Sequence, residues 1–161
     1  MAPTIEPAGT RDIETVTDMW VRLAEGQREY GSHILPGENR TAIRETVSRH
    51  VVSDATLVAR EGALVGFVMF TLERGTFEQD CLRGIVENLY VVPDRRSEGI
   101  GAALLDAAES TLLDRGAEVV SLEVMAQNEQ SREFYRQQGY DVHRVELEKH
   151  VESDTHSKGD R

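Results

Sequence analysis

Residues 96–102, Arg-Ser-Glu-Gly-Ile-Gly-Ala, combine charged side chains with two closely spaced glycines. They follow an apolar run that stops at Pro93, and they precede a stretch of helical apolar spacing that begins near Gly99. A strand that leads through such a turn into a helix presents free backbone N–H groups and the positive end of the helix dipole at one place. The segment therefore predicts an anion cradle suited to a phosphate group.

The spacing of this cradle disfavours two familiar classes of nucleotide site. A nucleoside triphosphate loop needs Gly-x-x-x-x-Gly-Lys-[Ser/Thr], and that pattern is not met here. The dinucleotide fingerprint needs a third glycine at the position that Leu104 occupies. A nucleotide-binding protein that uses the same cradle is therefore the less favoured interpretation.

Two motifs, in order, resemble those of the GNAT superfamily of acetyl-CoA-dependent N-acetyltransferases. Residues 96–101 match its cofactor signature, [Arg/Gln]-x-x-Gly-x-[Gly/Ala], directly after a strand that ends in Leu-Tyr-Val-Val-Pro. Residues 128–140, Asn-Glu-Gln-Ser-Arg-Glu-Phe-Tyr-Arg-Gln-Gln-Gly-Tyr, look like its second motif, Asn-x-x-[Ala/Ser]-x-x-Phe-Tyr-x-x-x-Gly-[Phe/Tyr]. The resemblance covers roughly residues 3–149, but it reaches motif quality only over 85–140.

This resemblance implies where acetyl-CoA would bind. The pyrophosphate would contact backbone N–H groups of the cradle, and the pantetheine arm would pair with strand backbone like an added strand. Ser97 replaces the glycine common there in the family, and Glu98 brings an acidic side chain close to the phosphates. The residues assigned to the cofactor are Tyr90, Val91, Val92, Arg96, Ser97, Glu98, Gly99, Ile100, Gly101, Ala102, Asn128 and Ser131.

The resemblance also implies two catalytic residues. Tyr135 matches the family tyrosine that protonates the leaving thiolate, since a phenol with a pKa of about 10 stays protonated at neutral pH. The alternative is that Tyr135 forms a core aromatic pair with Phe134. Glu87 lies in a stretch that resembles spermidine/spermine acetyltransferases, where a glutamate faces the amine. It could equally be a salt-bridged strand carboxylate, and Glu123 is a weaker candidate for the same role.

Composition limits the partners and the compartment. The chain has 29 acidic and 18 basic residues, a formal net charge of −11, and its lysines are Lys149 and Lys158. This acidity argues against nucleic acid as a partner, because phosphates would be repelled. A lysine-poor, acidic surface is similar to that of proteins from salt-rich cytoplasm. With one cysteine, no signal-like start and no membrane-length apolar run, a cytoplasmic protein is expected.

The predicted elements alternate in a way that favours an α/β (α+β mixed) fold. We expect a GNAT-like, mostly antiparallel mixed sheet of about six to seven strands with helices on both faces. Residues 1–150 should form a single domain, and residues 151–161 a disordered acidic tail. Strands are predicted over 5–8, 56–60, 63–73, 85–92, 117–125 and 140–149, and helices over 10–26, 41–51, 99–116 and 128–139.

The function that these observations favour is direct transfer of an acetyl group from acetyl-CoA to a primary amine of a small molecule or peptide. A non-catalytic CoA-binding sensor is the alternative. Residues 27–38, which include His33, are either a substrate-facing loop or a plain connector. Cys81 is a weak candidate nucleophile, and the histidines show no metal-ligand spacing, so no metal is expected. Family members often dimerise through late strands, so a homodimer is possible, whereas no membrane partner is expected.

Overall fold

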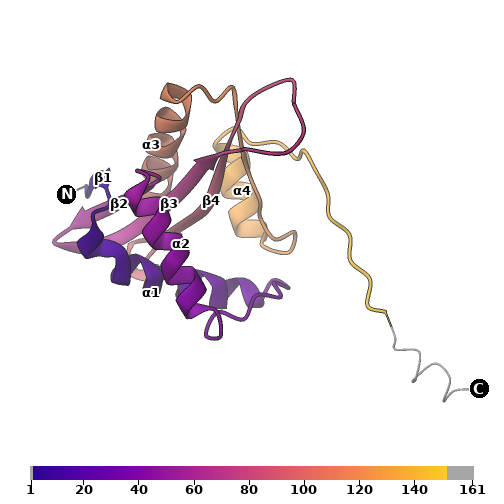
Figure 1. Ribbon diagram of the computed structural model, residues 1–161. Helices are drawn as coiled ribbons and strands as arrows, with labels where there is room; N and C mark the ends of the chain where they lie inside the picture. The colour runs from indigo at the N-terminus through magenta and orange to yellow at the C-terminus, as the bar shows by residue number, and fades with distance from the viewer. Residues whose placement is uncertain (1, 152–161) are drawn as a thin grey trace, which may run out of the picture.

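The computed structural model describes residues 2–151, and within them the fold is built on one five-stranded sheet (Figure 1). The strands lie side by side in chain order, β1-β2-β3-β4-β5. Their bounds are β1 Thr4–Pro7, β2 Thr56–Glu61, β3 Ala63–Leu72, β4 Arg83–Val91 and β5 Val119–Leu122. β3 is buried over most of its length, which explains its nearly continuous apolar sequence.

The first four strands pair antiparallel, and β4 pairs with β5 in parallel. β2 and β3 are joined by a tight turn at Gly62, whose φ of 74° is the left-handed conformation that glycine adopts without steric cost. The parallel pair is connected by α3, Ile100–Asp114, which crosses from the end of β4 to the start of β5. The predicted mixed, mostly antiparallel sheet is therefore confirmed.

Helices cover both faces of the sheet, as predicted. α1, Ile13–Arg28, and α2, Arg40–Val52, bury an apolar stripe against one face, around Phe67 and Met69. α3 buries Leu104, Leu105, Ala108 and Leu112 against the other face. α4, Glu129–Gln137, lies on the α3 side, where its aromatic residues pack against the same cluster. Each face thus has its own core, and the sheet separates the two.

Two short 3-10 turns precede helices α1 and α3. The turn η1, Thr10–Asp12, precedes α1, so the helical chain begins at Thr10, and Gly9 is its N-cap. Asp12 accepts a hydrogen bond from the Gly9 N–H at 2.9 Å and is paired with Arg60. The turn η2, Pro93–Arg95, ends β4 and leads into the predicted cradle.

The prediction of a last strand over 140–149 was wrong, and with it the count of six to seven strands. Residues 140–151 lie outside any strand, and the segment runs away from the sheet (Figure 1). Its apolar residues form two alternating pairs, Tyr140 with Val142 and Val145 with Leu147, which fall on opposite faces of an extended chain, so the segment has no continuous apolar face. A described contact of this arm joins Glu148 to His33 Nε2 at 2.9 Å. The predicted tail lies outside the described residues, apart from Val151.

Among residues 2–151, no helix is both long enough and apolar enough to cross a membrane.

Candidate active site

Glu87 lies at a β-bulge in β4. Met69 of β3 pairs with Asn88, whereas the next residue of β3 pairs with Val86, so Glu87 is the extra residue of the ladder. A bulge redirects a side chain away from the regular alternation of its strand. The Glu87 carboxylate consequently meets α2, where its Oε1 lies 2.6 Å from His50 Nε2.

β4 and β5 separate beyond their fourth paired position. The parallel ladder ends where Val86 faces Leu122, and β4 then continues to Val91 without a described partner strand on that side. The opened edge is the segment that the sequence assigned to pantetheine pairing. The Val92 N–H faces β3, where it donates to the Val65 carbonyl, whereas the Val91 carbonyl accepts from Arg96 Nε at 2.8 Å. A cofactor arm that pairs here would compete with Arg96 for that carbonyl.

The two predicted catalytic side chains line one small cavity at the point where the strands separate. Its volume is about 30 Å³, which is room for roughly two water molecules. Residues from α1, β4, β5 and α4 meet there, so the cavity forms only in the folded chain. It is lined by Leu23, Gln27, Val86, Glu87, Asn88, Leu89, Leu122, Glu123 and Tyr135. The alternative carboxylate, Glu123, therefore shares the cavity with Glu87.

Tyr135 combines a packed ring with a phenol that stays protonated. The ring makes edge-to-face contacts with Phe134 and Tyr140, at centroid distances of 5.2 and 6.0 Å. Burial raises the pKa of Tyr135 to about 12, so the hydroxyl keeps its proton throughout the neutral range. Among the side-chain hydrogen bonds of residues 2–151, none uses this hydroxyl, whereas Tyr140 donates to Glu109 at 2.6 Å. Tyr135 is thus part of an aromatic cluster and also places a protonated hydroxyl in the lining of the cavity.

Gly99, in the predicted cradle, has no close neighbouring atoms on the side where a side chain would lie. It is the N-cap of α3, with a φ of 85°, and a Cβ placed on it would meet no atom of the described residues within 4 Å. Within residues 2–151 no side chain caps α3, and its first turn carries no acidic residue, so anion-binding N–H groups are left free there. Gly101 faces inward instead, because its Cβ would lie 3.6 Å from Phe134. The start of α3 is therefore open at Gly99, and binding of an anion there remains a prediction.

The two charged residues of the cradle, Arg96 and Glu98, are each held by a neighbouring group. Ser97 has a φ of 65°, which is an uncommon conformation for a residue other than glycine. Arg95 donates to Glu98 at 3.0 Å and also pairs with Glu61. Glu98 is therefore paired with a cation, which reduces the repulsion that its charge would exert on a phosphate. Arg96 lies over the Tyr90 ring, with 5.4 Å between its guanidinium carbon and the ring centroid.

Asn128 and Ser131 act together as a helix cap. The Asn128 side-chain oxygen accepts from the Ser131 N–H at 3.1 Å and so caps α4. The cap fixes the start of the helix that carries Tyr135. Contact of either residue with a cofactor remains a prediction.

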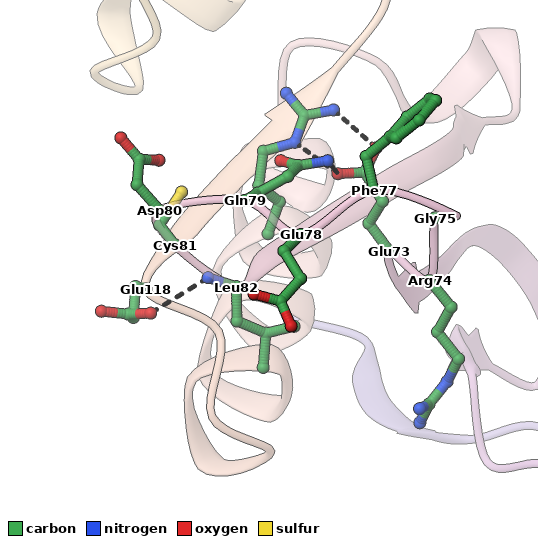
Figure 2. Close-up of a pocket in the computed structure, with 11 residues that line it drawn as sticks. Glu73, Arg74, Gly75, Phe77, Glu78, Gln79, Asp80, Cys81, Leu82 and Glu118 are labelled. Atoms are coloured by element: carbon green, nitrogen blue, oxygen red, sulfur yellow. Dashed lines mark hydrogen bonds and ion pairs between the residues drawn. The ribbon is translucent and has the colours of Figure 1, made fainter.

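A larger cavity, of about 510 Å³, lies in the loop between β3 and β4, at the opposite end of β4 (Figure 2). Its central carboxylate, Glu73, is already bonded to Gln79 and Arg83, each at 2.9 Å. Burial and the neighbouring Asp80 raise the pKa of the Cys81 thiol, so its reactive thiolate is disfavoured at neutral pH. The bonded Glu73 is therefore a poor base, and the protonated Cys81 is a poor nucleophile.

Sequence reasoning missed two polar residues of the site, namely His50 and Asn88, whereas Gln27 is the first residue of the segment over 27–38 for which a substrate-facing role was one of the two interpretations. For His50 a signal was available, because Ile43, Val47 and His50 are spaced as one helical face and the first two are buried. Its position predicts that the ring faces the sheet. Asn88 is brought to the cavity by the bulge, which depends on the register with β3 and leaves no local signal.

Comparison with known proteins places the chain among acetyltransferases. The family described as "Acetyltransferase (GNAT) family" matches residues 17–140. A protein of Archaeoglobus fulgidus described as an uncharacterized N-acetyltransferase is 29% identical over 135 residues, which cover 83% of this chain and 90% of that protein. An aminoglycoside N(6')-acetyltransferase of Klebsiella aerogenes is 29% identical over 109 residues, which cover 64% of this chain and 70% of the relative.

The fold also matches solved structures. An aminoglycoside N-acetyltransferase in complex with CoA superposes with a TM-score of 0.74 at 15% identity, covering 93% of this chain and 96% of the other. An N-acetyltransferase from Ralstonia eutropha superposes with a TM-score of 0.72 at 24% identity, covering 92% of this chain and 97% of the other. At these identities the two structures bear on the fold alone.

Proposed function

We propose, because the chain belongs to the acetyltransferase (GNAT) family, that it moves an acetyl group from acetyl-CoA directly to a primary amine. The observation that supports this most strongly is the cavity between β4 and β5. There a carboxylate, Glu87, and a protonated phenol, Tyr135, line one space beside an open strand edge. A proton acceptor and a proton donor around one cavity are what acyl transfer between an amine and a thiol requires.

Acetyl-CoA would be held by the cradle and by the free edge of β4. Backbone N–H groups from Gly99 to Ala102 would bind the pyrophosphate, aided by the dipole of α3. The opening at Gly99 has the room that this contact needs. Arg96, which already bonds the Val91 carbonyl, would exchange that bond for the incoming arm. When bound, acetyl-CoA supplies an acetyl group activated as a thioester.

The protein groups would handle two protons. The amine arrives as an ammonium ion and must lose a proton before it can attack, and the Glu87 carboxylate would accept it directly or through a water in the cavity. A carbon–nitrogen bond then forms as the carbon–sulfur bond of the thioester breaks. The Tyr135 hydroxyl would donate its proton to the departing sulfur, and the second proton that the nitrogen loses as the amide forms would restore the phenol. The proton held by Glu87 would pass to solvent. The products are the N-acetylated amine and CoA as a free thiol.

The acceptor that suits this cavity best carries a cationic amine group, since the cavity, at about 30 Å³, has room for that group and not for a whole acceptor. Glu87 and Glu123 both line it, and within that lining no cationic side chain is present among the described residues. A panel of polyamines, aminoglycosides, amino acids and peptides, assayed for acetyl-CoA-dependent thiol release, tests this. We expect the highest kcat/KM with polyamines or aminoglycosides. Equal rates with neutral or anionic amines would contradict a cationic acceptor.

We also propose that the protein is cytoplasmic and adapted to high salt, on the basis of its net charge of −11. Salt should raise the melting temperature, because it screens repulsion among the excess carboxylates over a Debye length that falls from about 10 Å at 0.1 M to roughly 3 Å at 1 M. Thermal unfolding in potassium chloride from 0.1 to several molar measures this, with sucrose as the uncharged control. A melting temperature that does not change with salt would contradict the proposal.

We also propose a homodimer, because residues 141–151 carry exposed apolar side chains that a second copy of the chain could bury. Val142, Val145, Leu147 and Val151 are between 70% and 89% exposed, and burying each would contribute about 1.5–3 kcal/mol. We expect sedimentation at micromolar concentration to give a dimer, and the double variant Val145→Asp, Leu147→Asp to give a monomer. Val52→Asp, at an exposed valine of α2, is the control and should stay dimeric. A wild-type monomer would rule this assembly out.

A further inference from the structure

His50 of α2 is engaged at both ring nitrogens. Its Nδ1 lies 2.8 Å from the Thr46 carbonyl oxygen, and its Nε2 lies 2.6 Å from Glu87 Oε1. The side chain is largely enclosed, at 16% exposure, whereas that of Glu87 is 35% exposed. The His50 ring is therefore fixed, and it faces the more accessible carboxylate.

The two contacts determine which protons the ring carries. A carbonyl oxygen can only accept, so the nitrogen beside Thr46 must carry hydrogen. A neutral ring would then direct the lone pair of Nε2 at a carboxylate oxygen, which is repulsive at this distance. The pair is thus stable with a proton between His50 and Glu87, and the hydrogen bond to the carboxylate raises the pKa of His50 above its ordinary value.

We propose that His50 is a positioning residue for amine deprotonation, whose Nε2–H anchors Oε1 of Glu87 so that Oε2 faces the cavity and receives the ammonium ion. This inference rests on the proposed function of Glu87. A glutamate side chain has three rotatable bonds, and a bulge residue lacks the regular cross-strand neighbours that would restrain it. The hydrogen bond from the His50 ring supplies that restraint from the opposite element.

Two substitutions separate positioning from simple packing. His50→Gln places an amide N–H near the position of Nε2 and can still donate to Glu87, whereas His50→Leu fills the space without a donor. We expect His50→Leu to lower kcat/KM for the amine about tenfold, with little change in the KM for acetyl-CoA. His50→Gln should recover most of the loss. In a Glu87→Gln background, His50→Leu should cause no further loss, because the interaction is already broken.

An activity-independent measurement tests the pair even if no acceptor has been found. NMR titration should give a higher pKa for His50 in the wild type than in Glu87→Gln, because only the wild type has the carboxylate. Glu87 favours protonated His50 on folding, so its stabilising contribution is present below about pH 6.5 and is lost as the pH rises through the raised pKa of His50. Arg49, on the same helix, opposes the shift and is present in both proteins.

The outcomes are distinct. Equal His50 titration in the wild type and Glu87→Gln would show that the pair does not form in solution. Wild-type kinetics in His50→Leu, or an equal loss in His50→Leu and His50→Gln, would overturn the positioning role although the pair exists. If the NMR shift is present but the wild type transfers no acetyl group to any amine, the proposed function fails while the pair itself stands.

Discussion

Replacing Tyr135 by phenylalanine should lower the turnover number by about 10² while the affinity for acetyl-CoA changes little. The substitution keeps the ring, and with it the edge-to-face contacts to Phe134 and Tyr140. It removes only the hydroxyl, whose pKa of about 12 keeps it protonated at neutral pH. The sulfur must then leave as a thiolate or take its proton from water. Steady-state kinetics with a confirmed amine, together with calorimetric titration of acetyl-CoA, measures both quantities.

Tyr140→Phe is the matched control. Tyr140 belongs to the same aromatic cluster, but its hydroxyl donates to Glu109 and the residue lies outside the lining of the cavity. This variant should have wild-type turnover, even if its melting temperature falls through loss of the hydrogen bond. Wild-type turnover in Tyr135→Phe would instead remove Tyr135 from the mechanism and leave it as a core aromatic residue.

Gly99→Val should weaken acetyl-CoA binding by about 100-fold or more, which corresponds to roughly 2.7 kcal/mol. A Cβ at this position enters the open space at the start of α3, where the pyrophosphate would approach the backbone. The valine side chain would exclude the phosphate from the N–H groups that bind it. Calorimetric titration of acetyl-CoA into the folded variant gives the dissociation constant directly.

The backbone of Gly99 complicates this substitution, because its φ of 85° is strained for any other residue. Gly116→Val imposes similar strain, since Gly116 has a φ of 100°, and it lies beyond the far end of α3, about 22 Å along the helix. Circular dichroism confirms that each variant is folded. If both variants bind acetyl-CoA equally well, Gly99 does not border the pyrophosphate site.

The strand, turn and helix around the cradle could be predicted because their signals are local. Pro93 ends the strand, Gly99 caps the next helix, and an apolar stripe continues through that helix. The antiparallel hairpin at Gly62 and the cap at Asn128 are equally local features. In each case neighbouring residues determine the conformation, so the amino-acid sequence alone was enough.

The prediction that was wrong and the contacts that were not predicted depend on residues far apart in the sequence. The bulge at Glu87 arises from register with β3, and its contact with His50 joins residues 37 positions apart. The expected strand over 140–149 follows Gly139, which ends the preceding helix, but pairing at a sheet edge also requires a partner strand, which the residues of the segment do not determine. The candidate base and acid could therefore be named from motifs, whereas their common cavity and the contact between His50 and Glu87 required the fold.

The most direct test of acetyl transfer is to measure free thiol and acetylated amine together, by thiol titration and mass spectrometry, in the presence of acetyl-CoA. We expect thiol release to depend on the amine, with one acetylated amine formed for each thiol released. Glu87→Gln and Tyr135→Phe should lower both products in parallel. Saturable binding of acetyl-CoA without thiol release above the buffer rate, for every amine in the panel, would contradict acetyl transfer and favour a CoA-binding sensor.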